Sequence, residues 1–116
     1  MNAPERILVV DDELHVVSFI QAEFVRLGHE VTVARDGREA LAILENQDFD
    51  RVYLDVMMPY VDGFQVLKWI RAHPTKKRTW VAFMTAQADN LDTYNRERIG
   101  ADHYVPKPFT AKDLLP

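Results

Sequence analysis

The chain has 116 residues, a formal net charge of −4 and no cysteine. The length predicts a single domain with a sizeable core, and the lack of cysteine excludes disulfides and thiolate metal sites. The acidic balance argues against direct binding of nucleic acid. The first apolar run is too short for a signal peptide or a membrane span, so a cytoplasmic location without membrane contact is expected.

Strand and helix patterns alternate along the whole chain without a linker or a repeat. The continuous apolar run 7–10 is typical of a strand covered on both faces, and the helical spacing that follows it ends at Gly28. Asp36 with Glu39 three residues later predicts a capping box for the second helix. In chain order the predicted elements are strand 7–10, helix 14–27, strand 29–34, a helix through Ala40 and Leu44, strand 51–54, helix 63–72, strand 80–84, helix 89–99, strand 102–105 and a short last helix over 111–115.

This alternation predicts an α/β fold. Short connections between strands and helices imply right-handed crossovers, a parallel sheet and helices on both faces. Five strands favour the doubly wound, flavodoxin-like order 2-1-3-4-5. The last helix is cut short, with Thr110 and Asp113 as its capping residues. The basic run 75–78 is expected to form a solvated loop at the edge of the sheet opposite the strand carboxyl ends.

Polar residues stand at four of the predicted strand ends. Asp55 closes the third strand, and the others are Asp11, Asp12, Thr85 and Lys107. In an open α/β sheet these ends share one edge, where ligands bind. Clustered carboxylates repel one another unless a cation neutralises them, and an all-oxygen donor set suits Mg²⁺.

The same residues suit phosphoryl transfer. A carboxylate such as Asp55 can act as a nucleophile toward a phosphoryl group. Lys107 would then clamp the phosphoryl oxygens, and the Thr85 hydroxyl would donate to them. Taken singly, each residue has a plainer interpretation. The pair Asp11 and Asp12 can cap a helix, Thr85 can bond to backbone, and Lys107 can be a loop charge.

Four motifs together resemble the receiver (CheY-like) domain of bacterial two-component response regulators. The resemblance runs from Arg6 to about Leu115, with Asp55 followed 30 positions later by Thr85 and a further 22 positions later by Lys107. The motifs are Asp11-Asp12, the stretch 54–59 with Asp62-Gly63, the stretch 84–86, and the stretch 100–109. The whole chain, 1–116, is therefore expected to be a receiver domain, the N-terminal part of a longer regulator.

The resemblance implies a signalling phosphoacceptor rather than an enzyme. A histidine kinase or a histidine phosphotransfer protein would donate the phosphoryl group to Asp55. Mg²⁺ would be held directly by Asp12 and Asp55, by Asp11 mainly through water, and by the backbone carbonyl of Met57.

A switch is also implied by the resemblance. Thr85 and Tyr104 would move together on phosphorylation, although Tyr104 can also be read as a packing aromatic. The output would pass through the face formed by the fourth helix, fifth strand and fifth helix to an output domain or partner protein, and a phosphorylation-dependent dimer is compatible with the family. The Lys107–Pro108 peptide would be cis.

Three alternatives differ in class. A phosphohydrolase of the haloacid-dehalogenase type resembles the site but carries a second Asp where this chain has Met57. A degenerate receiver that acts only through protein interaction would not need all five strand-end residues. A flavodoxin would need a phosphate-binding loop after the first strand, where the acidic run 11–13 would repel the phosphate.

Overall fold

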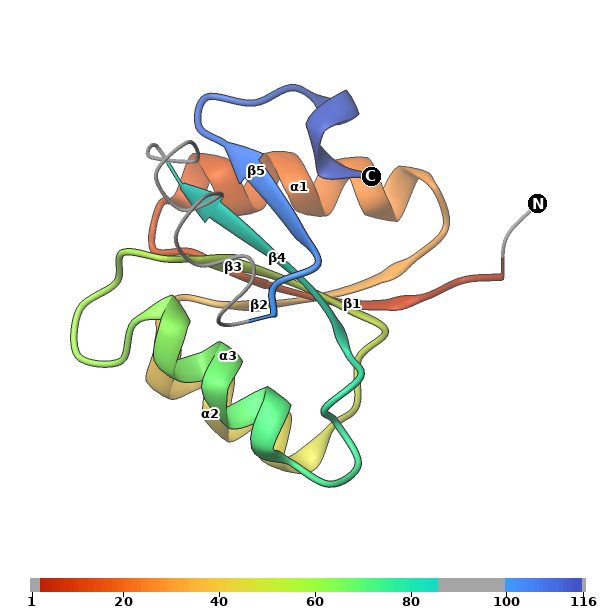
Figure 1. Cartoon of the computed structure of the whole chain (residues 1–116). Helices are drawn as coiled ribbons and strands as arrows, with labels where there is room; N and C mark the ends of the chain where they lie inside the picture. Colours follow the sequence, from red (N-terminus) through yellow and green to blue (C-terminus); the bar gives the residue numbers. More distant parts are fainter. Residues whose placement is uncertain (1–2, 86–99, 116) are drawn as a thin grey trace.

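The computed structural model describes residues 3–85 and 100–115. The five predicted strands all form and make one parallel sheet in the order β2-β1-β3-β4-β5 (Figure 1). This is the predicted flavodoxin-like order. The strands are β1 (Arg6–Val10), β2 (Glu30–Ala34), β3 (Arg51–Asp55), β4 (Trp80–Thr85) and β5 (His103–Pro106).

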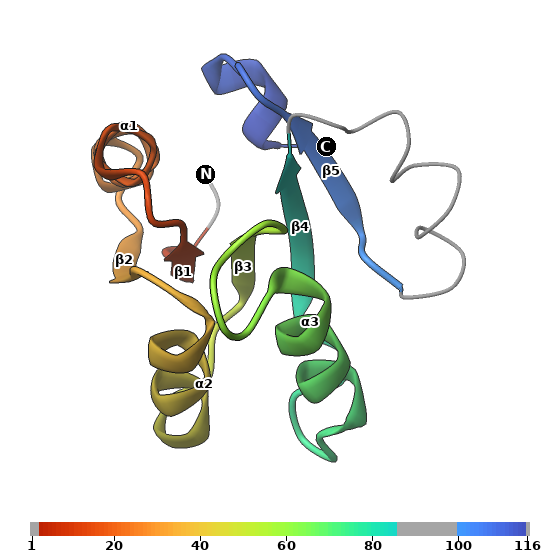
Figure 2. The same ribbon diagram turned by 90° about the vertical axis from the view of Figure 1, so that its left-hand side faces the viewer.

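Helices cover both faces of the sheet. Figures 1 and 2 show α1 and the C-terminal turn on one side of the strands, and α2 and α3 on the other. The predicted helix over 89–99 lies outside the described residues. No helix in the described part of the chain has the length and apolar character needed to cross a membrane. The described helices are α1 (Leu14–Arg26), α2 (Gly37–Asn46), α3 (Gly63–Ala72) and a short 3₁₀ turn, η1 (Ala111–Leu114).

The side chains of each strand contribute alternately to two separate cores, because successive side chains of a strand point to opposite faces of the sheet. On the side of α2 and α3 lie Leu8, Val52 and Phe83, among others. Ile7 and Val9 from the same first strand pack on the other side, against α1 and η1. Both faces are therefore buried, which explains the continuous apolar runs in the sequence.

Side chains cap the starts of two helices, and a glycine follows the end of a third. Gly28 has φ +92° just after α1, a conformation that costs glycine little. Asp36 forms one half of its predicted box, with Oδ1 accepting from the Glu39 N–H at 2.8 Å. A complete capping box forms at the start of α3, between Asp62 and Gln65, at a position where the sequence analysis did not predict one.

The C-terminal segment forms only a short 3₁₀ turn, and side chains of the sheet hydrogen-bond to it. Asp113 accepts from the Thr110 N–H at 2.8 Å, as their spacing predicts. The Tyr53 hydroxyl on β3 donates to the Leu114 carbonyl, and His103 Nε2 lies 2.9 Å from the Asp113 carbonyl. Side chains of β3 and β5 therefore fix η1 on the α1 side of the sheet.

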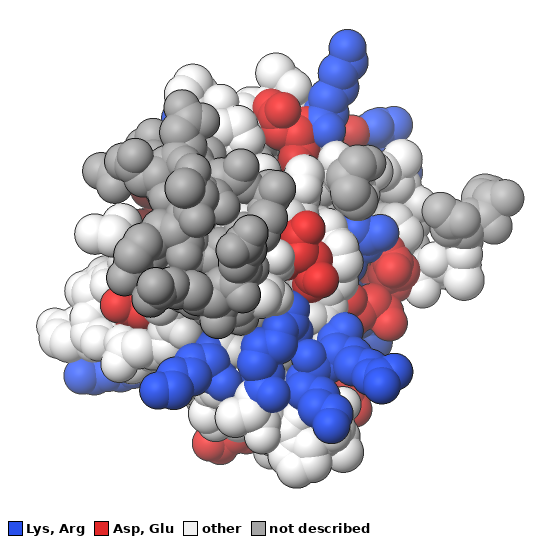
Figure 3. All heavy atoms as spheres, in the orientation of Figure 1, with Lys and Arg blue, Asp and Glu red and all other residues white. Residues whose placement is uncertain are grey.

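Basic side chains gather away from the strand carboxyl ends. Figure 3 shows Lys and Arg grouped over the end of α3 and the connection to β4. That connection carries Lys76, Lys77 and Arg78. Lys76 corrects the expectation of a fully solvated loop, since it is only 7% exposed, and its Nζ donates to the Gln47 carbonyl at 2.9 Å and to Asp48 Oδ1 at 2.6 Å.

Candidate functional site

The carboxyl ends of the strands meet at one edge, as predicted. Backbone hydrogen bonds continue the sheet past the strand ends, from Asp11 N to the Ala34 carbonyl at 3.1 Å and from Lys107 N to the Thr85 carbonyl at 2.9 Å. The Lys107–Pro108 peptide is cis, which confirms that expectation. A pocket of about 190 Å³ at this edge is lined by Asp12, Glu13, Asp55, Met57, Thr85 and Lys107.

The alternation of the strands sorts these residues by face. Three site residues project toward the α1 side, because each comes two positions after a residue of the core on that side. They are Asp11 after Val9, Asp55 after Tyr53, and Lys107 after Val105. Thr85 follows Phe83, which belongs to the core on the α3 side. The acids and the lysine therefore share one wall of the site, and the hydroxyl stands on the other.

Three carboxylates converge at the acidic wall. One oxygen from each of Asp11, Asp12 and Asp55 lies within 4.8 Å of the others. Asp11 is fully buried, Asp55 is 5% exposed and Asp12 is exposed. Asp11 Oδ1 accepts from the Glu13 N–H at 3.0 Å, so Asp11 also shapes the turn into α1. This is not the helix cap of the plainer interpretation, because the N-cap residue of α1 is Glu13 and Asp11 bonds the N–H of that residue rather than one in the first turn.

Lys107 is the cation of the site. Its Nζ lies 2.8 Å from Asp11 Oδ2, 3.2 Å from Glu13 Oε1 and 3.5 Å from Asp55 Oδ1. Burial lowers the pKa of Lys107, but its close contact with Asp11 and the charges of Asp55 and Asp11 outweigh that effect and leave the pKa raised. Lys107 therefore stays an ammonium.

Asp55 is the perturbed acid of the cluster. Burial is the main cause that raises its pKa, and repulsion from Asp11 adds to it; Lys107 and the backbone of Met57 act in the opposite direction, and the pKa settles at about 6. Both raising causes disfavour charge on Asp55. A perturbed carboxyl group with specific charged neighbours in a pocket is typical of a functional site.

The donor set fits a hard divalent cation. The side chains of Asp11, Asp12 and Asp55 offer only carboxylate oxygens, and oxygen ligands are the chemistry that Mg²⁺ prefers. Asp11 Oδ2 is buried, and no hydrogen bond of good geometry reaches it from the described residues. Its contact with Lys107 is an ion pair. One lysine cannot neutralise three carboxylates, and a divalent ion would remove the remaining repulsion.

Thr85 and Tyr104 lie on the α3 side of the strand ends. Thr85 is 5% exposed, and Tyr104 is 7% exposed. Tyr104 pairs with Phe83 in the register of β4 and β5, and the two rings meet edge to face with centroids 6.0 Å apart. Tyr104 therefore lies on the strand next to that of Thr85, opposite the residue two positions before Thr85, and its ring is packed inward.

Two residues between the end of β3 and the first turn of α3 have backbone conformations or contacts that restrict which side chains fit there. Gly63 starts α3 against the acceptor strand, and a Cβ there would lie 2.5 Å from the Asp55 carbonyl oxygen. Tyr60 has φ +67°, and the Val61 N–H donates to the Pro59 carbonyl across it at 2.8 Å, which is the strained form of the γ-turn. The stretch 54–59 and the Asp62-Gly63 motif pointed to this loop in the sequence, but neither signal included Tyr60.

The comparison with family models agrees with this geometry. Residues 7–116 match the model described as the response regulator receiver domain. The chain belongs to the response regulator receiver family. Receiver domains are the signalling phosphoacceptors of two-component systems. The resemblance and the fold class predicted from the sequence are both confirmed.

Relatives of this receiver domain include longer regulators. It is 37% identical over 110 residues to the alkaline phosphatase synthesis transcriptional regulatory protein PhoP of Bacillus subtilis, covering 95% of this chain and 45% of PhoP. The chain therefore spans about 45% of the length of that curated relative.

Solved structures of similar receiver domains share the fold. The Vibrio cholerae chemotaxis response regulator CheY4 superposes with a TM-score of 0.89 at 30% identity, over 97% of this chain and 93% of CheY4. The receiver domain of the sensor histidine kinase PA1611 from Pseudomonas aeruginosa superposes with a TM-score of 0.85 at 32% identity, over 97% of this chain and 92% of that one. The PA1611 structure has a magnesium ion coordinated in its active-site cleft.

Proposed function

We propose that Asp55 is the phosphoacceptor of this receiver domain and that Asp11, Asp12, Asp55 and the backbone carbonyl of Met57 hold Mg²⁺ there. The observation that carries the proposal is the nearly buried Asp55 carboxylate, within 4.8 Å of two other carboxylates and 3.5 Å from one ammonium group. An ionised carboxylate at this position is a nucleophile held beside a cationic clamp. A bound magnesium ion would neutralise charge on the acceptor and on the transferred group.

The transfer itself is a single exchange of bonds at phosphorus. An Asp55 carboxylate oxygen forms the new bond to phosphorus while the bond between phosphorus and the donor nitrogen breaks. The donor histidine keeps the electron pair of the broken bond, and its imidazole is again neutral after the exchange of one proton with water. With a pKa of about 6, Asp55 is mostly ionised at neutral pH and ready to attack. Lys107 then donates to the phosphoryl oxygens.

Thr85 and Tyr104 are proposed to read the phosphoryl group. The Thr85 hydroxyl would turn toward it, and the space left on the α3 side would stabilise the inward position of the Tyr104 ring. Such switches shift populations between states, with couplings of roughly 1–3 kcal/mol. Thr85→Ala is expected to abolish the response of the Tyr104 ring signals to phosphorylation in NMR spectra. A Tyr104 response of the same size in that variant would refute the coupling.

The regulator around this domain is proposed on family grounds. A histidine kinase or histidine phosphotransfer protein is the proposed donor, acting in the cytoplasm. The domain is proposed to be the receiver part of a longer regulator, as in PhoP, of which it covers 45%. The proposed output face includes β5 and the C-terminal turn, and its fourth-helix part lies outside the described residues. A phosphorylation-dependent dimer stays a proposal.

The deciding experiment is the intact mass of the protein after incubation with a small phosphodonor, with and without Mg²⁺. Wild type is expected to gain one phosphoryl group only with Mg²⁺, and Asp55→Asn is expected to gain none. Asp50→Asn is a matched control from the other end of β3 and is expected to behave as wild type. Equal labelling of Asp55→Asn would move the acceptor to another residue. Failure of wild type with both a small donor and a histidine kinase would overturn the proposed chemistry.

A further inference from the structure

Glu13 has a side chain that its own helix does not use. It occupies the N-cap position of α1, but its side chain makes no capping hydrogen bond. N-cap residues usually bond their side chain to the first turn. The backbone of Glu13 is fixed independently, because its N–H donates to Asp11 Oδ1 at 3.0 Å. The carboxylate is therefore free to serve a purpose outside the helix.

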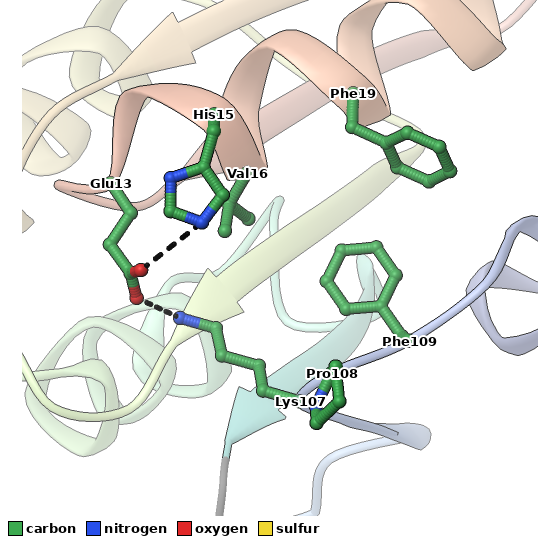
Figure 4. A pocket seen from close by; sticks show the side chains of 7 residues that line it. All are labelled: Glu13, His15, Val16, Phe19, Lys107, Pro108 and Phe109. Atoms are coloured by element: carbon green, nitrogen blue, oxygen red, sulfur yellow. Dashed lines mark hydrogen bonds and ion pairs between the residues drawn. The ribbon is translucent and has the colours of Figure 1, made fainter.

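That carboxylate is directed at the cation of the phosphoryl site. Glu13 Oε1 accepts a hydrogen bond from Lys107 Nζ at 3.2 Å, and Oε2 lies 3.5 Å from His15 Nε2. Figure 4 shows the Glu13 carboxylate between the imidazole and the ammonium group. The Glu13 side chain is 47% exposed, whereas that of Lys107 is 16% exposed. Glu13 is therefore the more exposed partner of this contact.

Glu13 and Lys107 together form a partition. They are the two residues shared by the pocket of about 190 Å³ that holds Asp55 and a neighbouring pocket of about 570 Å³ between α1 and the residues after β5. A lysine ammonium has three N–H donors. Asp11, Glu13 and Asp55 all lie within 3.5 Å of it, so a phosphoryl oxygen must displace or share one of these contacts.

We propose that Glu13 is a positioning residue that holds Lys107 in the unphosphorylated domain and competes with the phosphoryl group for its ammonium. The inference rests on the proposed function of Asp55 and deepens it. Of the three partners, Asp11 is fully buried and Asp55 becomes part of the phosphorylated group, so the half-exposed Glu13 is the partner that can withdraw. Its negative charge also opposes an incoming anion. Glu13 thereby favours the unphosphorylated form of the domain over the phosphorylated form.

The first test measures the competition with a phosphoryl mimic. Beryllofluoride is titrated at saturating Mg²⁺, and binding is followed by NMR of the backbone amides. Glu13→Gln is expected to lower the dissociation constant for beryllofluoride by about two- to fivefold, the range that partly exposed ion pairs contribute. The affinity for Mg²⁺ alone is measured separately for each protein, so that an effect on the ion is not mistaken for an effect on Lys107.

The second test needs neither metal nor mimic. In metal-free protein, the order parameter of the Lys107 side-chain ammonium is expected to fall in Glu13→Gln, because a neutral amide oxygen accepts a weaker hydrogen bond from the ammonium than a carboxylate does. Glu23→Gln is the matched control: it makes the same charge change on α1, where Glu23 pairs with Arg26, and is expected to alter neither measurement. Glu13→Asp keeps the charge but shortens the reach by one methylene, so it is expected to resemble Glu13→Gln.

Two results would overturn the proposal. One is an unchanged ammonium order parameter together with an unchanged affinity for beryllofluoride in Glu13→Gln. The other is a wild-type affinity in Glu13→Asp, or a shift in Glu23→Gln as large as that in Glu13→Gln, since either would reduce the effect to net charge. Should wild type bind no beryllofluoride, the proposed function fails, and the ammonium measurement in metal-free protein still decides whether Glu13 holds Lys107.

Discussion

Replacing the proposed acceptor is expected to stabilise the metal-free domain. Burial first, and then the charge of Asp11, raise the pKa of Asp55 from 3.8 to about 6. The folded protein therefore resists ionisation of this group. Since a tenfold change in a protonation equilibrium is worth about 1.4 kcal/mol, keeping Asp55 ionised at pH 7 lowers the free energy of unfolding by up to about 3 kcal/mol. Asp55→Asn removes that penalty while preserving the shape of the side chain.

The dependence on pH has a definite sign. Between about pH 4 and pH 6 the folded state binds the Asp55 proton more tightly than the unfolded state, so the stability of wild type falls as the pH rises through this window. Asp55→Asn lacks this loss. Its advantage over wild type is expected to be largest near pH 7 and to fade toward pH 4, where Asp55 is protonated in the folded wild-type protein.

Urea unfolding without metal ions at pH 7 and pH 4 measures the difference. Glu45→Gln is the matched control, because Glu45 is exposed on α2 and such surface changes usually stay within about 0.5 kcal/mol. Addition of Mg²⁺ is expected to raise the stability of wild type more than that of Asp55→Asn, since the ion would relieve the same repulsion. A variant no more stable than wild type at pH 7, or a gain as large at pH 4, would refute the electrostatic argument.

Two further predictions concern the surroundings of the site, and a third concerns the opposite edge of the sheet. Lys107→Ala is expected to raise the pKa of Asp55 further above about 6, because Lys107 is one of the groups that lower it; ¹³C NMR titration of the carboxyl group measures this, and an unchanged or lower pKa would contradict it. Gly63→Ala is expected to cost about 1–3 kcal/mol and to impair phosphoryl uptake, because its Cβ would meet the Asp55 carbonyl oxygen at 2.5 Å; wild-type stability and labelling would show that the loop accommodates the methyl group. Arg71→Lys is expected to lose about 2–4 kcal/mol in urea unfolding, since the guanidinium bonds the carbonyls of Gly100, Lys77 and Thr79, and a loss below about 0.5 kcal/mol would refute that estimate.

The sequence predicted the fold because its signals are local and agree with one another. Continuous apolar runs of strand length need two covered faces, and their alternation with helical spacing leaves few topologies once crossovers are right-handed. The residues of the site followed from the same logic, since parallel strands deliver their carboxyl ends to one edge. Asp11, Asp12, Asp55, Thr85 and Lys107 were therefore all predicted to converge, and the structure places them around one pocket or its acidic wall.

Other features depend on contacts between distant segments, which no local pattern encodes. The burial of Lys76 depends on its meeting Asp48 and Gln47, 28 and 29 positions away. The approach of Gly63 to the acceptor strand depends on how α3 docks. The reach of Glu13 to Lys107 spans 94 positions. The sequence by itself determined the chemistry at the strand ends, because the strand period and topology impose it. Only the tertiary structure decided which charge meets which, because that depends on distances of a few ångströms between side chains brought together by folding.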